Sequence, residues 1–184
     1  MPVSRELIIR WSRGCSKGYG PVVLIRDVAD PDWPAIYDII RAVVQEGRSF
    51  AYPEDLTADA AHDVWSMNEP GRTVVAVDGD LVLGTATMTS NRDGRGSHIA
   101  TGSFMVSPAH RRSGVGRALG EHVVQWATDT GYRGIQFNAV VENNLDAVNL
   151  WRSLGFEIIG TVPEAFHHAD GDYVGLHVMF LGIR

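Results

Sequence analysis

The chain has 184 residues, of which 45% are hydrophobic and 21% charged, and its formal net charge is -6. This length and composition fit one soluble globular domain with a sizeable core, so a second full domain is not expected. The negative charge argues against general nucleic-acid binding, which needs a surplus of Lys and Arg to replace counterions along the phosphate backbone.

The first half of the chain predicts an N-terminal extension, two helices and the start of a sheet. Residues 1–20 contain a candidate short strand at Leu7-Ile8-Ile9 and then three glycines, and we interpret them as an extension before a domain at 21–184. The expected elements are a strand over 21–28, a helix from Asp30 or Asp32 to Gln45, and a helix that Thr57 caps and Gly71 ends.

The pattern then changes from helical spacing to β-rich runs. Three strands, expected over 73–77, 81–89 and 99–106, should form an antiparallel meander. The remaining expected elements are a helix over 114–130, a strand over 135–141, a helix over 145–154, and strands over 156–160 and 173–181. The first of these helices is amphipathic, because apolar residues recur every three or four positions, and Gly131 supplies its C-terminal stop.

Cysteine usage and apolar runs bear on the cellular compartment. The single cysteine, Cys15, cannot form a disulfide within the chain. The first residues of the sequence do not resemble a signal peptide, because Arg5 and Arg10 interrupt the only apolar stretch there. No apolar run approaches the ~20 residues needed to cross a bilayer. We therefore expect a cytoplasmic protein that does not span a membrane.

The connection into the helix over 114–130 has the composition of an anion site. It reads Arg111-Arg112-Ser113-Gly114-Val115-Gly116, followed by Arg117. Free backbone N–H groups and the positive end of the helix would converge on an anion, and the glycines would let it approach the main chain. Taken alone, the pattern is also typical of a solvated, arginine-rich helix start. A nucleotide-binding P-loop is disfavoured because the Gly-Lys-Ser/Thr ending is absent.

Two segments carry further information in their order and spacing. The first, 104–119, joins the end of a strand to Pro108 and the glycine turn, and the second, 143–156, contains Ala147, Leu150-Trp151 and Gly155-Phe156. They resemble signatures A and B of the GNAT superfamily of acyl-CoA N-acyltransferases. The resemblance covers roughly residues 21–181. It implies an α/β fold with a mixed, mostly antiparallel sheet of six or seven strands, flanked by about four helices and splayed between the strands 99–106 and 135–141.

The resemblance also implies a site for acetyl-CoA as co-substrate, with pantetheine lying in the splay. The residues it assigns to the co-substrate are Met105, Val106, Arg111, Arg112, Ser113, Gly114, Val115, Gly116, Arg117, Asn144 and Trp151. The Val106 backbone N–H would be catalytic, since it would hold the thioester oxygen. Many relatives place a tyrosine at the position of Trp151, where it protonates the departing thiolate, and an indole N–H is not a practical acid.

Residues for the acceptor follow from a closer likeness. The segment 137–144 is similar to the subgroup that acetylates proline analogues such as azetidine-2-carboxylate, in which an asparagine at the place of Asn138 helps to hold the acceptor. Thr101 takes the place of that subgroup's second asparagine. Apart from this likeness, Tyr52 and Phe50, in the loop between the first two helices, could form the acceptor wall, although aromatic residues in such a loop as often fill the core. Asn138 is therefore assigned to both substrate binding and catalysis. Because it is expected on a buried strand, its amide needs a partner, since an unpaired one would cost ~1 to 3 kcal/mol.

No general base stands out from the sequence. His98 and Glu142 are candidates, although an α-amino group with a pKa near ~8 would need little help. The mixed segment 167–172 contains metal-capable side chains, but its spacing fits no standard zinc or calcium template, so no metal is expected.

The sequence predicts an enzyme that transfers acetyl from acetyl-CoA to the amine of a small molecule by direct attack in a ternary complex. An amino acid or its analogue is the expected acceptor. Acetylation of protein N-termini or lysines, and a non-catalytic acyl-CoA sensor, stay open. Neither nucleic acid nor a membrane is an expected partner, and the apolar strand at 177–181 could support a homodimer.

Overall fold

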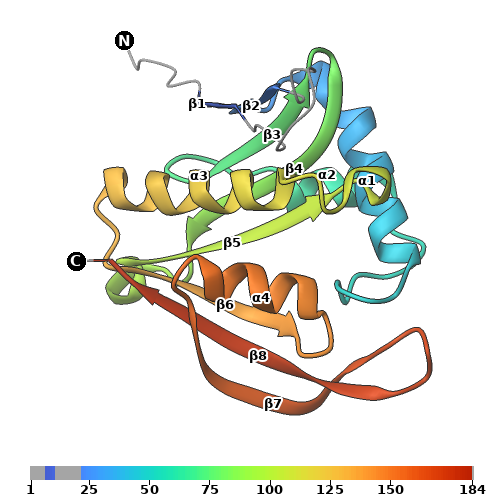
Figure 1. Ribbon diagram of the computed structural model, residues 1–184, viewed down its shortest axis with the longest axis vertical. Coiled ribbons are helices and arrows are strands. Elements are labelled where there is room, and N and C mark those ends of the chain that lie inside the picture. Colours follow the sequence, from blue (N-terminus) through green and yellow to red (C-terminus); the bar gives the residue numbers. More distant parts are fainter. Residues whose placement is uncertain (1–6, 11–21, 184) are drawn as a thin grey trace, which may run out of the picture.

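The computed structural model describes residues 7–10 and 22–183, and its centre is one mixed sheet (Figure 1). The strands are β1 (Leu7–Arg10), β2 (Val22–Asp27), β3 (Arg72–Asp78), β4 (Leu81–Ser90), β5 (Ile99–Val106), β6 (Gly134–Val141), β7 (Glu157–His167) and β8 (Tyr173–Gly182). Their order is β1-β2-β3-β4-β5-β6-β8-β7. The seven strands from β2 onward are those of the expected fold, and β1 adds an eighth at the edge beside β2. Cys15 and most of residues 1–20 lie outside the described residues.

Four helices cover the two faces of the sheet, as Figure 1 shows. They are α1 (Trp33–Gln45), α2 (Ala58–Trp65), α3 (Val115–Thr130) and α4 (Leu145–Ser153). The apolar stripe of α1 packs with Met105 of β5 in one core cluster. The apolar side of α3 packs with Ala100 of β5 and Phe137 of β6 in the other. The sheet therefore has an α1/α2 face and an α3/α4 face. None of the helices in the described part of the chain is long and apolar enough to cross a bilayer.

The sheet splits between its two central strands. β5 and β6 are parallel and pair only at Ile99 with Gly134 and at Ala100 with Ile135. Beyond that point β4 keeps β5 paired as far as Val106, whereas β8 holds β6 as far as Val141. The strands part because each follows its own antiparallel neighbour. The predicted splay is confirmed.

Two expected boundaries were wrong. The second helix ends at Trp65 rather than near Gly71, because Ser66 adopts an extended conformation (φ -83°, ψ 117°) and the Trp65 indole is buried, donating to Thr85 at 3.0 Å. β7 continues to His167, far beyond residue 160, because a register shift after Val162 carries its pairing with β8 past Pro163.

The C-terminal strand lies inside the sheet. β8 pairs with β6 on one side and with β7 on the other, so both of its edges are occupied. The outer edge at this end belongs to β7, where Ile159 and Val162 are exposed. An edge-to-edge homodimer would therefore use β7 and not the strand at 177–181.

Candidate functional site

The turn between β5 and α3 presents unpaired backbone donors. A short 3-10 turn over Pro108–His110 leaves β5, and the Ser113 hydroxyl donates to its His110 carbonyl at 2.6 Å. Gly114 then caps α3 in the left-handed region (φ 90°). The first helical hydrogen bond runs from Ala118 N–H to the Gly114 carbonyl at 3.0 Å. The backbone N–H groups of residues 115–117, which precede Ala118, are therefore free to bind an anion at the positive end of the helix.

Small residues bring this helix end close to the sheet. A Cβ at Gly84 of β4 would lie 2.9 Å from the Met105 carbonyl and 3.0 Å from Val115 Cγ1, so glycine permits the contact. By contrast, a Cβ at Gly116 would meet Leu150 Cδ2 at 3.5 Å and Val106 Cγ2 at 3.8 Å, which are ordinary contacts. The fold itself therefore does not require glycine at 116.

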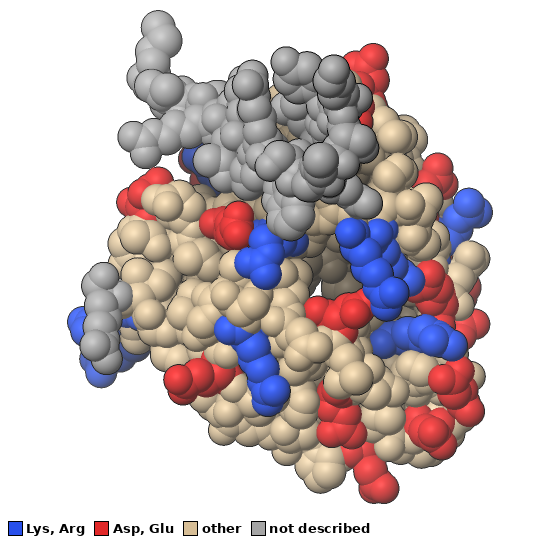
Figure 2. Space-filling model, viewed as in Figure 1, with Lys and Arg blue, Asp and Glu red and all other residues tan. Residues whose placement is uncertain are grey.

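The three arginines of the turn all have polar partners. Arg111 pairs with Glu46, the residue that caps the C-terminus of α1. The other pairs join Arg112 to Asp146 at 3.1 Å, Arg117 to Glu121 at 3.6 Å, and Arg117 to the Ser153 hydroxyl at 2.7 Å. Figure 2 shows basic and acidic side chains mixed around a hollow in this face of the molecule. These partly exposed pairs hold the guanidinium groups at the turn, where an anion can compete for them.

The open edge of β5 offers two backbone positions. In an antiparallel pair, residues alternate between bonding the neighbouring strand and pointing away from it. Ser107 N–H donates to the Leu83 carbonyl at 2.9 Å, so Met105 and Ser107 face β4, whereas Phe104 and Val106 face the splay. The expectation for Met105 therefore needs correction: its backbone serves the β4 ladder, and its side chain, 1% exposed, lies in the α1/α2 core. Phe104, which the motif did not single out, shares the open edge with Val106.

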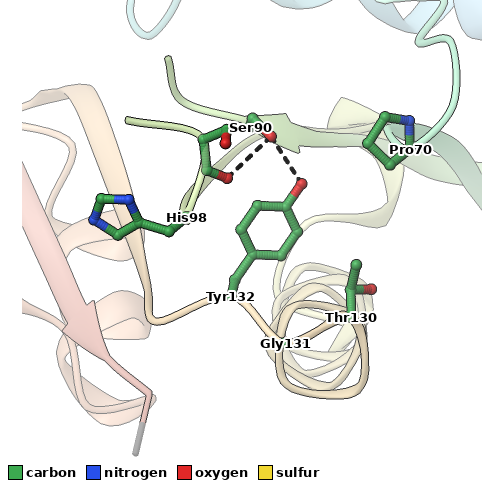
Figure 3. A pocket seen from close by; sticks show the side chains of 7 residues that line it. Pro70, Ser90, His98, Thr130, Gly131 and Tyr132 are labelled. Carbon is green, nitrogen blue, oxygen red and sulfur yellow. Dashed lines mark hydrogen bonds between the residues drawn. The ribbon is translucent and has the colours of Figure 1, made fainter. Parts of the chain in front are cut away.

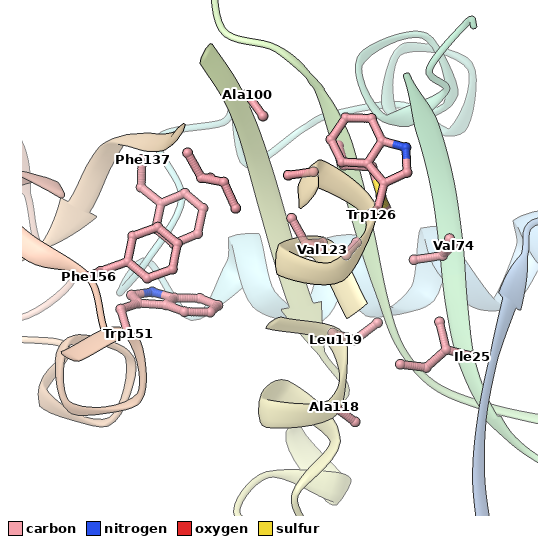
Figure 4. Packing of buried hydrophobic residues seen from close by; sticks show 14 of the residues in the cluster. Ile25, Val74, Ala100, Ala118, Leu119, Val123, Trp126, Phe137, Trp151 and Phe156 are labelled. Carbon is pink, nitrogen blue, oxygen red and sulfur yellow. The ribbon is translucent and has the colours of Figure 1, made fainter. Parts of the chain in front are cut away.

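Trp151 lies in the aromatic wall on the α3/α4 side. Its ring centroid lies 4.6 Å from that of Phe104 and 4.8 Å from that of Phe137. Figure 4 shows the indole beside Phe137 and Phe156. A Cβ at Gly120 of α3 would come within 2.8 Å of the Trp151 ring, so that glycine lets α4 lie against α3. Trp151 thus fills the space between the two helices and the sheet with an apolar ring.

Asn144 caps the helix that carries Trp151. Its side-chain oxygen accepts from the Ala147 N–H at 3.3 Å, an N-cap bond of α4. Within the described part of the chain, its amide nitrogen makes no hydrogen bond. The cap therefore fixes the oxygen and leaves the nitrogen as a donor at the mouth of the splay.

An amide bridge crosses the α1/α2 face where the strands part. Asn138 donates to the Asn91 side-chain oxygen at 2.6 Å and accepts from Gln136 at 2.8 Å. Asn138 is exposed, so the expectation of a buried amide was wrong, and its partners are side chains. Thr101 lies on the same face of β5 as Met105 and pairs with Thr89 of β4. Asn91, the partner of Asn138 in this bridge, comes from the connector after β4.

The loop after α1 places Tyr52 on this same face. Its ring stacks on Phe50 at 5.7 Å between centroids, and Phe50 in turn packs on Trp65 at 6.0 Å. Burial raises the pKa of the Tyr52 hydroxyl, so it stays protonated at neutral pH. Tyr52 is thus a partly buried aromatic side chain with a neutral hydroxyl.

The tip of the β7–β8 hairpin contacts that loop. The Ala169 N–H donates to the Gly47 carbonyl at 2.9 Å, and Arg48 pairs with Asp170 at 3.2 Å. His168 is buried and lies 3.2 Å from Asp170. No group of three or more metal-capable side chains converges among the residues the structure describes.

Neither candidate base lies free at the splay. His98 precedes β5 and lies with Tyr132 and Pro70 in a pocket at the end of that strand opposite Val106 (Figure 3). The Glu142 carboxylate accepts the Gly175 N–H at 2.6 Å and replaces a main-chain acceptor in the sheet. The Glu142 carboxylate is therefore engaged in a structural hydrogen bond.

Comparison with known proteins identifies the family. The sequence model described as the Acetyltransferase (GNAT) family matches residues 33–156. This chain belongs to the GNAT family. A GCN5-related N-acetyltransferase from Kribbella flavida is 52% identical, and the match covers 88% of this chain and 98% of that one with a TM-score of 0.85.

Two curated acetyltransferases are also similar. Streptothricin acetyltransferase of Streptomyces lavendulae is 31% identical over 72% of this chain and 68% of its own length. N-acetyltransferase aca1 of Schizosaccharomyces pombe is 37% identical over 46% of this chain, a match that spans only 40% of that relative's length. As a GNAT protein, the chain is an acetyl-CoA-dependent acetyltransferase, and the geometry fits that co-substrate. The free amides before Ala118 suit the pyrophosphate, and the open edge at Phe104 and Val106 suits the pantetheine.

Proposed function

We propose that this GNAT protein acetylates the amine of a small molecule, an amino acid or an analogue of one, by direct attack in a ternary complex. The observation that carries the proposal is the amide bridge between Asn138 and Asn91 on the α1/α2 face. It lies across the sheet from the anion-binding turn and from Trp151. Donor and acceptor would thus reach the splay from opposite faces.

Three parts of the chain would hold acetyl-CoA. The amides of Val115, Gly116 and Arg117 would bind the pyrophosphate, with Arg111 and Arg112 adding charge. Ser113 supports the turn by its bond to His110. The Phe104 and Val106 main chain and the Asn144 amide nitrogen would bind the pantetheine. Acetyl-CoA supplies the activated thioester, and the Val106 N–H is the donor we assign to the thioester oxygen.

The acceptor side favours a small polar amine. The side chains that we assign to the acceptor are amides and hydroxyls: Asn91, Asn138 and Thr101, with Tyr52 in the loop after α1. Such groups can hydrogen-bond a carboxylate and an amine without burying a charge of their own. The contact between Gly47 and Ala169 joins two loops on this face and limits the width of the approach. Streptothricin acetyltransferase is likewise named for a small molecule.

Proton handling needs no strong base under this proposal. An α-amino group with a pKa near ~8 is partly neutral at the pH of the cytoplasm, where we place the protein. A cyclic secondary amine is more basic, so it would have to lose its proton to water before it attacks. Trp151 has no hydroxyl that could protonate the leaving thiolate. We therefore assign protonation of the thiolate to a water molecule at the open side of the splay. We propose cyclic secondary amines such as azetidine-2-carboxylate as the finer acceptor class, because the two asparagines of the amide bridge would face the acceptor.

The test is release of free thiol from acetyl-CoA over a panel of amino acids, cyclic secondary amines and peptides. We expect turnover with small amines and none with peptides. Turnover with peptides alone would indicate a protein acetyltransferase. Silence across the panel, with acetyl-CoA bound in calorimetry, would indicate a sensor.

Asparagine variants locate the acceptor. Asn138→Ala and Asn91→Ala should each raise the acceptor KM by about 3- to 10-fold, the effect of one lost hydrogen bond, without changing CoA affinity. Asn149→Ala, on the exposed side of α4, is the matched control and should change neither quantity. Wild-type KM values in all three variants would show that the acceptor does not bind at the amide bridge.

We also propose a homodimer through the outer edge of β7. An exposed edge strand with apolar side chains is a site for pairing with another chain, and Ile159 and Val162 are 59% and 53% exposed. Light scattering after gel filtration should give twice the chain mass, and Ile159→Glu should give a monomer. A monomeric wild-type protein would contradict this.

A further inference from the structure

Arg111 of the pyrophosphate turn is shared with a second segment of the chain. Its guanidinium pairs with Glu46, whose backbone ends α1. The side chain of Arg111 is 45% exposed and that of Glu46 is 29% exposed, so an incoming phosphate can reach the pair. The cation that should meet the pyrophosphate is therefore already neutralised by a carboxylate.

The next two residues after Glu46 connect to the β7–β8 hairpin. Gly47 has a φ of 60° and accepts the Ala169 N–H at 2.9 Å, while a Cβ at Gly47 would come within 2.9 Å of Ala169 Cβ. Arg48 pairs with Asp170 at 3.2 Å. We call the contacts of Gly47 and Arg48 with Ala169 and Asp170 the strap. It joins two loops on the acceptor face, and Glu46 precedes it directly in the chain.

We propose that Glu46 is a positioning residue which couples occupancy of the CoA site to opening of the strap. A pyrophosphate at the amides of α3 binds Arg111 more strongly than a single carboxylate does, because it brings more charge and accepts from the guanidinium and the helix end together. Glu46 then loses its partner and faces a like charge. Its displacement moves Gly47 and Arg48 and loosens the strap.

The consequence is ordered binding, which rests on the proposed function. In the CoA-free protein, the Arg111–Glu46 pair holds the end of α1 and the strap stays closed over the acceptor face. With CoA bound, the two loops separate and the acceptor enters. The equilibrium between closed and open strap is the element that both sites bias.

Amide hydrogen exchange of the full chain with and without CoA tests this, since exchange reports local opening. In the wild-type protein, CoA should speed exchange in residues 46–52 and at Ala169. In Glu46→Gln, exchange there should already be fast and should not respond to CoA, and CoA should bind about two- to fivefold more tightly because Arg111 is unpaired. Glu121→Gln is the matched control: it removes the ion pair of Arg117 in the same turn, has no link to the strap, and should keep the wild-type response.

A second variant opens the strap from its other side. Arg48→Gln removes the pair with Asp170, and it should speed exchange at Ala169. Because opening of the strap and CoA occupancy are coupled, it should also tighten CoA binding modestly. Calorimetry distinguishes failure of the proposed function from failure of the coupling, because absence of CoA binding would overturn the proposed function itself. Binding of CoA without a change in exchange, or a wild-type response in Glu46→Gln, would overturn the coupling alone.

Discussion

Gly116→Ala should change the affinity for CoA without lowering the stability of the fold. A Cβ at this position would meet Leu150 and Val106 only at 3.5 and 3.8 Å, so no atom has to move. Alanine also favours a helix over glycine by up to about 1 kcal/mol. The variant should therefore be as stable as the wild-type protein or slightly more so.

Its affinity for CoA should fall. The added methyl group stands beside the amides that would bind the pyrophosphate, and loss of one hydrogen bond to a charged group costs about 1.5–3 kcal/mol, or roughly a 10- to 150-fold weaker Kd. Calorimetry with CoA and a thermal melt on the same sample measure both quantities. Gly116→Glu, which adds a negative charge, should abolish binding. Undiminished affinity in a stable Gly116→Ala variant would refute the assignment of the pyrophosphate site.

Further predictions concern packing, pH and the reaction. Gly120→Ala should lower the free energy of unfolding by about 1–2 kcal/mol in denaturant titration, because the new Cβ overpacks the Trp151 ring; equal stability would contradict the packing argument. Arg26 holds the pKa of the Asp32 carboxyl below its usual value, with N–O distances of 2.6 and 2.8 Å. That carboxylate therefore stabilises the fold above pH ~3.9 and loses its contribution as the pH falls through the lowered pKa. Asp32→Asn should cost about 1–2 kcal/mol at pH 7 and flatten the acid limb of a stability profile, and an unchanged limb would argue otherwise. Tyr52→Phe should raise the acceptor KM about 3- to 10-fold at unchanged CoA affinity, and steady-state kinetics with equal KM would remove Tyr52 from the acceptor wall. Trp151→Tyr should leave kcat no higher in the thiol-release assay, and a rise would mean that protonation of the thiolate limits the wild-type rate.

The local elements were largely predictable because their signals are local. The β-rich runs of β3 to β5, the apolar stripe of α3 and the two signatures each depend on residues close in sequence. The extent of β7 was not predictable in this way, because Pro163 reads as a stop and only the pairing with β8 carries the strand past it. Trp65 ends α2 by packing into the core, which no neighbour in the sequence reveals.

The site was predictable where a motif spans it and not where the fold assembles it. The glycine turn and Val106 came from one segment, but the choice of Phe104 over Met105 depends on which residues of β5 bond β4. Asn91 and Glu46 lie 47 and 65 residues from their partners Asn138 and Arg111. Neither belongs to a recognisable pattern, and only the folded chain brings each pair together.

The most direct test of the account is a crystal structure of this chain with CoA bound. It should place the pyrophosphate within hydrogen-bond distance of the amides of residues 115–117, and the pantetheine along the open edge of β5 at Phe104 and Val106. A CoA molecule bound elsewhere, or one whose pantetheine runs outside the splay between β5 and β6, would contradict the account.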